Sequence, residues 1–476
     1  MLKRMRSFLV LVMLFITVTM SAQVTTATMS GKVTAQDEPI IGATVVAVHE
    51  PSGTRYGTVT NVSGQFNLQG MRTGGPYKVE ISYVGYQTAI YKGINLLLGE
   101  NYVLNVSLKE SSELLDEVVV TASKESNMKS DRAGAIMNAN RDMISNTPTI
   151  SRSISDIMRL SPQGADVGNG FAVGGGNYRQ SFVTVDGAAF NNTFGLGGNL
   201  PANGSPISLD ALEQVTVAVT PFDVRQSGFT GGAINAVTRS GDNQFRGTVY
   251  GYFNNENLRG DKVEDYKLTR SKSQYYTYGA SFGGPIIKDK LFFFVNGEYE
   301  DNVTAGSSYQ PRTSLDQEYT GNVRRPVENT IVDGNETWVG LNDMRQYLKE
   351  KYNYDPGRYN NYSVNTPAYR IMARLDWNAN LNNKLSLRFT KTHTKDSNFP
   401  SSSTSPLSAD DIYPGDTGLG IPKGKDSGRS TKYSMSFENS NYYQVRDFTS
   451  VAGEWNSRFA NGAMNNMLRF AYSYQN

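Results

Sequence analysis

Hydrophobic and polar residues alternate with a period of two through most of the chain. The alternation is clear around Val45 and Ala47, again around Val79 and Ile81, and later at residues 384–390. A period of two places successive side chains on opposite faces of an extended backbone, so it predicts strands with one apolar face. Turn residues such as Gly, Asn and Pro separate the runs. The pattern therefore predicts a mainly β protein.

The first 22 residues depart from this pattern. Lys3, Arg4 and Arg6 precede an apolar run over residues 8–18, and the small residues that follow end at Ala22. A basic start, an apolar centre and small residues at a cleavage point are typical of a signal peptide. The run is shorter than the roughly 20 residues of a membrane-spanning helix. We expect residues 1–22 to direct export, and any membrane insertion to use strands.

Residues 23–109 have the spacing of a small β-sandwich, with about seven short strands and turns at residues 50–53 and 61–64. The stretches "SGKVTAQDEPIIGATVVAV" and "GTVTNVSGQFNL" closely resemble the carboxypeptidase regulatory-like domain. That resemblance implies an accessory sandwich without catalytic groups. His49 and Glu50 have no further ligands for a zinc site, and His49 is expected on the surface of a strand.

A linker at residues 110–130 contains "LLDEVVVTAS", in which two acidic residues precede three valines. β-Branched valines favour an extended backbone, and an exposed strand can add to the sheet edge of another protein. A buried strand is the alternative interpretation of such a run. After a sandwich of this kind, the segment resembles the TonB box of Bacteroidetes receptors. The resemblance assigns the box to Asp116, Glu117, Val118, Val119, Val120, Thr121 and Ala122.

Residues 131–240 are predicted to form a mixed α/β domain. The expected elements are helices at 153–160 and 209–214 and strands at 182–185 and 215–219. The stretches "FVTVDGAAF" and "SGFTGGAINAVTRSG" resemble the plug domain of TonB-dependent receptors. The glycines of residues 168–176 lack the Lys-Ser/Thr of a phosphate-binding loop, so a flexible plug loop is the preferred interpretation.

Residues 241–476 are predicted to be the first part of an antiparallel transmembrane β-barrel. Alternating strands are expected at residues 369–379, 384–390, 432–438 and 468–474. Short turns alternate with long polar stretches at residues 301–366 and 391–432, which is the pattern of periplasmic turns and outer loops. A soluble sandwich would share the strand period but not this asymmetry. Aromatic residues expected at the membrane interfaces are Phe253, Tyr299, Trp377 and Trp455.

TonB-dependent receptors close their barrels with about 22 strands. The 236 residues of 241–476 are too few for that number, so we expect the chain to be part of a longer protein or a truncated one. The stretches "SGFTGGAINAVTRSG" and "GASFGGPIIKDKLFFFVNGEYE" look like the Oar-like branch of the family. The Tyr-Gly-Ser/Thr-Arg-Gly plug segment of the SusC-like branch is not found, which argues against a glycan substrate and a lipoprotein lid.

The composition argues against enzymatic and nucleic-acid functions. The 46 Lys and Arg residues nearly balance the 44 Asp and Glu residues, so no concentrated basic face is predicted for nucleic acid. The chain has no cysteine, and its two histidines, His49 and His393, fall in different predicted domains. Nucleophile–histidine catalysis and thiolate metal sites are therefore excluded, and no cofactor is expected.

Charged residues in the barrel strands suggest how the plug is retained. Glu298 and Glu454 are expected to face the barrel lumen, where Arg225 and Arg239 of the plug are candidate partners. We refer to this expected set as the plug–barrel latch.

The resemblance implies a function in active import across the outer membrane. Its expected partners are the TonB energy-transducing complex, outer-membrane lipid, the barrel assembly machinery and an extracellular peptide, glycan or chelate. The alternative is an outer-membrane adhesin or structural barrel protein that transports nothing.

Overall fold

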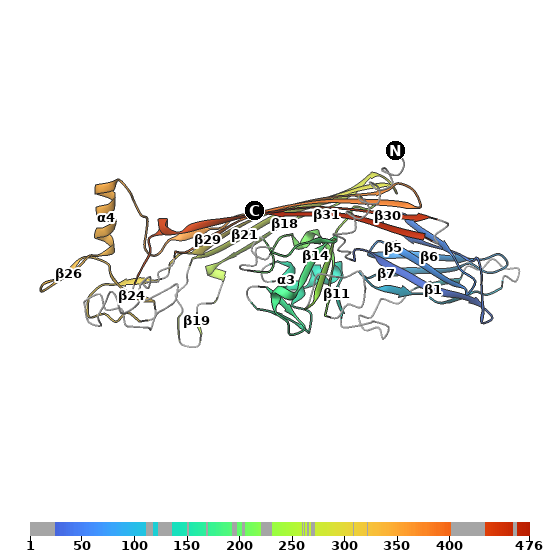
Figure 1. The fold of residues 1–476 in the computed structure, drawn as a ribbon, viewed down its shortest axis with the longest axis horizontal. Helices are drawn as coiled ribbons and strands as arrows, with labels where there is room; N and C mark the ends of the chain where they lie inside the picture. The colour runs from blue at the N-terminus through green and yellow to red at the C-terminus, as the bar shows by residue number, and fades with distance from the viewer. Residues whose placement is uncertain are drawn as a thin grey trace, which may run out of the picture.

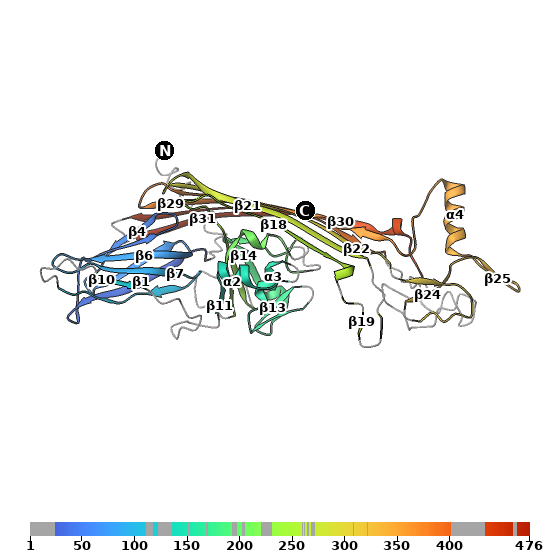
Figure 2. The ribbon, with the colours of Figure 1, turned by 180° about the vertical axis from the view of Figure 1, so that it is seen from behind.

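A computed structural model describes residues 24–476 with gaps at 111–117, 122–135, 150–151, 168–169, 193–197, 202–204, 220–230, 259, 261, 264–265, 268–271, 308, 321, 401–433 and 460–463. The molecule is elongated (Figure 1). A long antiparallel sheet runs along it, and a mixed domain and an N-terminal sandwich lie beside one another under that sheet. Figure 2 shows the same arrangement from behind, with the sheet arching over both domains.

The N-terminal sandwich consists of two sheets packed face to face. Its period-two pattern turns Met29, Val45, Leu68 and Ile81 inward, where each is fully buried. The first sheet contains β1 (Ala27–Ala35), β2 (Glu38–Pro39), β5 (Gln65–Met71), β8 (Asn101–Val103) and β9 (Val106–Ser107). The second has the order β10 (Val118–Thr121), β7 (Ala89–Leu96), β6 (Gly74–Ser82), β3 (Thr44–His49) and β4 (Thr54–Val59).

The expectation that His49 lies on the surface is wrong. His49 continues the inward series of Val45 and Ala47 along β3, and it is only 5% exposed. Its ring lies 5.0 Å from that of Tyr77, and Nδ1 is 2.7 Å from Ser52 Oγ. Burial, with a smaller effect from Arg72, lowers the pKa of His49 to about 2. The imidazole is thus a neutral core group.

The mixed domain is built on one five-stranded sheet. Its order is β11 (Ile136–Ala139), β16 (Leu212–Ala218), β17 (Ala233–Thr238), β14 (Phe182–Val185) and β15 (Ala188–Ala189), with β14 and β17 parallel. The helices are α2 (Arg141–Asn146) and α3 (Ile154–Met158), with short 3-10 turns η2 (Tyr178–Gln180) and η4 (Leu209–Ala211). A two-stranded ribbon, β12 (Gly164–Asp166) and β13 (Phe171–Val173), completes the domain.

Of the two helices predicted in this domain, one forms and the other does not. The helix expected at residues 153–160 is α3, which begins after a capping box formed by Ser153 and Asp156. The helix expected at residues 209–214 is wrong, because only one 3-10 turn forms there. Leu212 already pairs with Thr238, so the strand ladder takes over the rest of the segment.

The long sheet is an antiparallel meander. Its order is β18 (Arg246–Asn255), β21 (Ser273–Ile287), β22 (Leu291–Ala305), β28 (Ala368–Asn378), β29 (Asn383–Asn398), β30 (Tyr442–Phe459) and β31 (Met464–Gln475). A short strand, β27 (Ser363–Asn365), also pairs with β22. Within the part of the chain that the structure describes, β18 and β31 each have one neighbour, so this sheet is open.

The predicted alternation holds along β29. Leu387 and Phe389 are exposed on the outer face, while Arg388 and Thr390 are buried against the domain below. The four aromatic residues expected at the interfaces are also exposed to a large extent, at 49% for Phe253, 47% for Tyr299, 50% for Trp377 and 40% for Trp455. The outer face is therefore an apolar surface suited to lipid.

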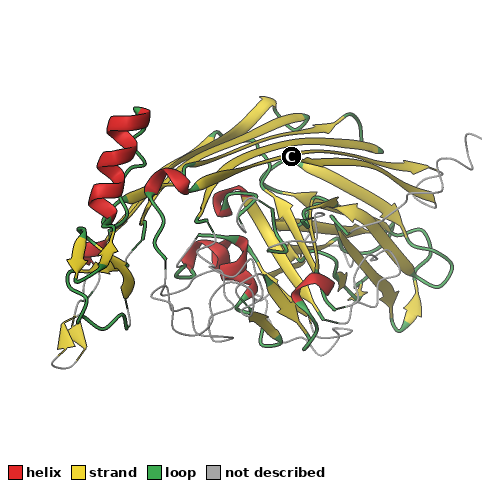
Figure 3. Cartoon of the chain, turned by 60° about the vertical axis from the view of Figure 1, so that its left-hand side comes forward, coloured by secondary structure: helices red, strands yellow, loops and turns green. Residues whose placement is uncertain are grey.

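The end of the sheet farthest from the sandwich carries a small folded module (Figure 3). It contains β23 (Gln310–Arg312), β24 (Val323–Val327), β25 (Ile331–Asp333), β26 (Glu336–Trp338) and α4 (Leu341–Tyr352). The nearby elements are η5 (Glu256–Leu258), β19 (Lys262–Val263), β20 (Tyr266–Lys267) and η6 (Glu438–Ser440). None of the helices in the described residues is long and apolar enough to cross a membrane.

The strand predicted at residues 432–438 is wrong. Residues 434–437 have no strand pairing, and Phe437 is buried with Leu341 and Tyr359 beside α4. The rings of Tyr359 and Phe437 are 6.2 Å apart. The apolar side chains of this segment pack against the module instead of a membrane-facing sheet. The next sheet strand begins only at Tyr442.

Candidate functional site

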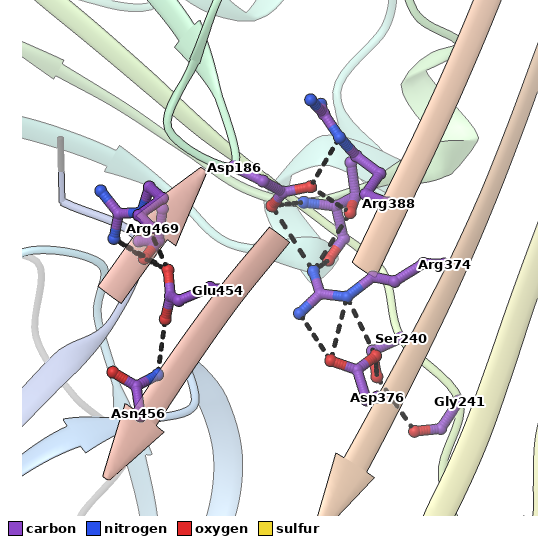
Figure 4. Close-up of polar contacts among 11 residues, drawn as sticks. Asp186, Ser240, Gly241, Arg374, Asp376, Arg388, Glu454, Asn456 and Arg469 are labelled. Atoms are coloured by element: carbon purple, nitrogen blue, oxygen red, sulfur yellow. Dashed lines mark hydrogen bonds and ion pairs between the residues drawn. The ribbon is translucent and has the colours of Figure 1, made fainter. Parts of the chain in front are cut away.

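Asp186 is the central contact between the mixed domain and the sheet above it. It follows β14 in a tight turn with a left-handed φ of 46°, and Gly187 continues the turn at 77°. Its carboxylate accepts hydrogen bonds from the Thr238 N–H (2.9 Å) and hydroxyl (2.6 Å). The same carboxylate faces two arginines of the sheet, at 3.5 Å from Arg374 Nη1 and 3.5 Å from Arg388 Nε (Figure 4).

Arg374 connects this turn to a second carboxylate. From β28 it donates to Asp376 through Nε and Nη2, both at 2.9 Å, and its Nη1 donates to the Thr238 carbonyl at 2.8 Å. Asp376 also accepts a hydrogen bond from the Ser240 hydroxyl. A buried arginine is stabilised by such complete pairing. The end of β17 is consequently fixed to β28.

Arg388 is less completely paired. Its side chain is 2% exposed, Nη2 donates to Ser450 Oγ at 3.0 Å, and the guanidinium lies 5.2 Å from the Phe190 ring centroid. Among the described residues, Nη1 has no hydrogen-bond partner. Asp186 therefore supplies the carboxylate that faces this buried cation.

A second polar cluster lies around Glu298 on β22. Arg370 Nη1 contacts Glu298 Oε1 at 3.0 Å and Glu300 Oε2 at 2.9 Å, all three from the sheet. Glu298 Oε2 accepts from Ser208 Oγ of the mixed domain at 2.8 Å and from Tyr250 OH at 2.7 Å. Two backbone carbonyls of the same segment are also bound by the sheet, Ser205 by Arg370 and Pro206 by Thr392.

Apolar packing accompanies these polar contacts. Phe190 of the mixed domain meets Phe448 of β30 edge to face, with ring centroids 4.6 Å apart. Phe294 and Met372 of the sheet belong to the same buried cluster as the core of the mixed domain. The two parts therefore share one continuous core.

The sandwich is fastened to one end of the same sheet. Asn378 Nδ2 donates to Thr54 Oγ1 at 2.9 Å, and Arg72 Nη2 donates to the Gly241 carbonyl at 3.1 Å. Thr25 Oγ1 donates to Glu454 Oε2, which also pairs with Arg469 at 2.8 Å. A cavity of about 90 Å³ remains where the sandwich, the mixed domain and the sheet meet.

The residues of the expected latch occupy separate places. Arg225 lies outside the described residues. Arg239 Nη1 donates to the Asp210 carbonyl at 3.3 Å, and its guanidinium lies 4.7 Å from the Phe294 ring centroid. Within the described part of the chain, Arg239 thus contacts the Asp210 carbonyl and the Phe294 ring, and it pairs with neither Glu298 nor Glu454. Glu298 reaches the mixed domain through Ser208, whereas Glu454 contacts the sandwich.

The pairing that joins the two parts has the opposite polarity from the expected one. The mixed domain supplies the acid, Asp186, and the sheet supplies the bases, Arg374 and Arg388. The alternation of these arginines with outward-facing residues indicated an inward position for them. The sequence contained no comparable signal for Asp186, because its orientation depends on the turn.

Four residues of the expected TonB box are described. Val118–Thr121 form β10, which lies parallel to β7 at the edge of the sandwich. Asp116, Glu117 and Ala122 fall in segments outside the described residues.

Comparison with known proteins assigns the chain to a family. Residues 237–445 match the outer membrane beta barrel domain, and residues 28–109 match the carboxypeptidase regulatory-like domain. The TonB-dependent transporter Oar of Myxococcus xanthus is 25% identical over 300 residues, covering 60% of this chain. The chain is thus similar to TonB-dependent receptors and contains an outer membrane beta barrel domain. The long sheet is accordingly barrel wall located in the outer membrane.

Other proteins to which the chain is similar are also named as receptors. The TonB-dependent receptor SusC of Bacteroides thetaiotaomicron is 29% identical over 281 residues, covering 56% of this chain. The matched part covers 26% of Oar and 26% of SusC, so the chain spans about a quarter of the length of these relatives. The siderophore receptor PirA of Acinetobacter baumannii aligns with a TM-score of 0.42 at 15% identity, covering 72% of this chain and 40% of that one. These relatives are named as transporters and receptors.

Proposed function

We propose that this receptor imports an extracellular substrate by energy-coupled displacement of its plug. One observation carries the proposal: the mixed domain, which we assign as the plug, covers the inner face of the barrel wall and contacts it through Asp186, Arg374 and Arg388. These ion pairs and the hydrogen bonds around Glu298 can exchange their partners for water when the plug moves. We further propose that these contacts, rather than Arg225 and Arg239 with Glu298 and Glu454 alone, act as the latch.

The topology of the plug supports a pull from its N-terminal side. We propose that Asp116–Ala122 is the TonB box, to which the TonB complex adds a strand. The first plug strand after the box is β11, an edge strand that pairs only with β16 among the described strands. A pull on the box would therefore load one four-residue ladder before it reached the core of the plug.

The remaining partners follow from the same proposal. The exposed apolar face of the wall would contact outer-membrane lipid, and the barrel assembly machinery would insert it. The module that contains α4 lies at the end of the wall opposite the sandwich, so it would face the cell exterior and meet a peptide, glycan or chelate.

An adhesin or structural barrel is the alternative function. Such a protein would need the outer module and the lipid-facing wall, but it would not need a plug that can be released. The presence of the plug therefore favours import.

TonB capture by the receptor tests the coupling assignment. In Val119→Pro the box loses a backbone donor and cannot form a regular ladder, so we expect purified TonB periplasmic domain to lose binding to the receptor. Ser126→Pro, which places a proline in the same linker outside the box, should bind TonB normally. Equal TonB binding by the two variants would contradict the assignment.

A further inference from the structure

The expected TonB box already has a strand partner within this receptor. β10 extends the second sheet of the sandwich by pairing in parallel with β7. Four consecutive residues pair: Val118 with Ala89, Val119 with Ile90, Val120 with Tyr91 and Thr121 with Lys92. Without β10, this edge of β7 would present unpaired N–H and C=O groups.

The length of the β7 edge matches the length of β10. Directly after Lys92, Gly93 has a left-handed φ of 79°, and the pairing of β6 with β7 shifts register between Tyr77 and Val79. An extra residue of this kind bends a strand and interrupts its ladder. The regular edge at residues 89–92 therefore ends where β10 ends.

The C-terminal end of the sandwich lies close to this edge of β7 and so brings the following box to it. The Gln87 N–H donates to the Lys109 carbonyl at 2.9 Å, and Tyr86 forms a bridge with Glu110. The sandwich thus ends beside residues that immediately precede β7, and seven residues separate Glu110 from Val118. A connection this short gives an effective concentration on the order of millimolar for the strand at its edge.

From these three features we infer that the β7 edge at residues 89–92 is a docking site for the TonB box, and that docking competes with TonB. That TonB is the partner that competes with β7 rests on the proposed function. Alternate residues of a strand direct their backbone groups to opposite edges. The N–H and C=O groups of β10 that pair with β7 are not available to TonB while the box is docked, so addition of TonB through this edge requires release from β7.

Docking also determines where a pull would act. The sandwich is fastened to the barrel wall through Thr54, Arg72 and Thr25. A force on a docked box would load the sandwich and these contacts before the plug strand β11. Release from β7 is thus a step that precedes plug displacement.

A disulfide between β10 and β7 tests this inference. The 476 residues of this chain contain no cysteine, so Thr121→Cys with Lys92→Cys introduces a single pair within them, one on each strand. Neighbouring strands are about 4.8 Å apart, which is within the Cα range of a disulfide. The control joins Thr121→Cys to Arg55→Cys, since Arg55 is exposed on β4 at the opposite edge of the same sheet.

The complete receptor in outer membranes would be oxidised with diamide and then exposed to the TonB periplasmic domain. We expect the 92/121 pair to cross-link and the 55/121 pair not to. We also expect cross-linking to weaken TonB binding about tenfold or more, with recovery on reduction. Absence of the 92/121 cross-link would overturn the docking site.

Two other outcomes separate this inference from the proposed function. A cross-linked receptor that still binds TonB fully, while Val119→Pro does not, would overturn competition and leave the coupling assignment intact. A receptor that cross-links at 92/121 but binds no TonB even when reduced would support the docking site and contradict the coupling assignment.

Discussion

Asp186 is the central polar contact between the mixed domain and the wall, because two buried arginines of the wall face its carboxylate. The turn that holds it is itself fixed by two hydrogen bonds from Thr238. Removing one member of a buried ion pair leaves an uncompensated charge, which costs more than the net value of the pair. This asymmetry makes Asp186 a sensitive point for substitution.

Asp186→Asn tests this role with little change of shape. Asparagine tolerates the left-handed φ of 46°, so the turn should persist while the negative charge is lost. We expect the plug to be destabilised by about 3 kcal/mol, because Arg388 loses its carboxylate while Arg374 keeps Asp376. The urea concentration at which the plug becomes susceptible to protease measures the effect.

Asp166→Asn is the matched control for this substitution. Asp166 also pairs with an arginine, Arg159, but both side chains are partly exposed at the plug surface. Its loss should change stability by less than about 0.5 kcal/mol. Equal urea dependence of the Asp186 and Asp166 variants would show that the contacts with the wall do not retain the plug.

The residues of this contact could be predicted only in part from the sequence. Strand periodicity is local, and it places Arg374 and Arg388 on the face opposite the exposed apolar residues of their strands. The partner could not be found in this way, because Asp186 lies 188 residues before Arg374 and meets it only through the seating of the plug. His49 shows a different limit, because it continues the inward period of Val45 and Ala47 while the polarity of its side chain favoured a surface position.

At the scale of elements, period-two alternation predicted the central wall strands because each of them is exposed on one face and packs against the mixed domain on the other. Leu387 and Arg388 follow this rule within β29. The segment around Phe437 has the same period but no strand, since its apolar side chains are buried by Leu341 and Tyr359. The pattern reports which residues are buried or exposed, but it does not identify the surface that covers them.

Leu387→Arg tests whether the outer face of β29 meets lipid. Leu387 is 51% exposed and is the fifth of the 16 residues of β29. An arginine facing the bilayer centre costs about 2–4 kcal/mol, so the folded fraction of the receptor in outer membranes should fall. Semi-native electrophoresis measures that fraction. Leu387→Phe should fold normally, and normal folding of both variants would argue against a lipid-facing position.

At the scale of the whole molecule, three folded parts share one junction. The sandwich and the plug both bind the barrel wall, and the box that would receive the pull is paired with the sandwich. This arrangement connects the periplasmic end of the receptor to the contacts around Asp186 and Glu298. The central claim is that an external pull releases the plug from those contacts.

Chemical labelling of a plug cysteine tests that claim most directly. Ser208 is 1% exposed and donates a hydrogen bond to Glu298 across the interface between the mixed domain and the wall, so Ser208→Cys would place the sole thiol of this chain there. In cells that express the complete receptor in its natural growth medium, we expect a small maleimide to react severalfold faster when the proton-motive force is intact than after addition of an uncoupler. Val119→Pro should remove this difference. Equal labelling with and without the proton-motive force would contradict energy-coupled plug displacement and favour a barrel that transports nothing.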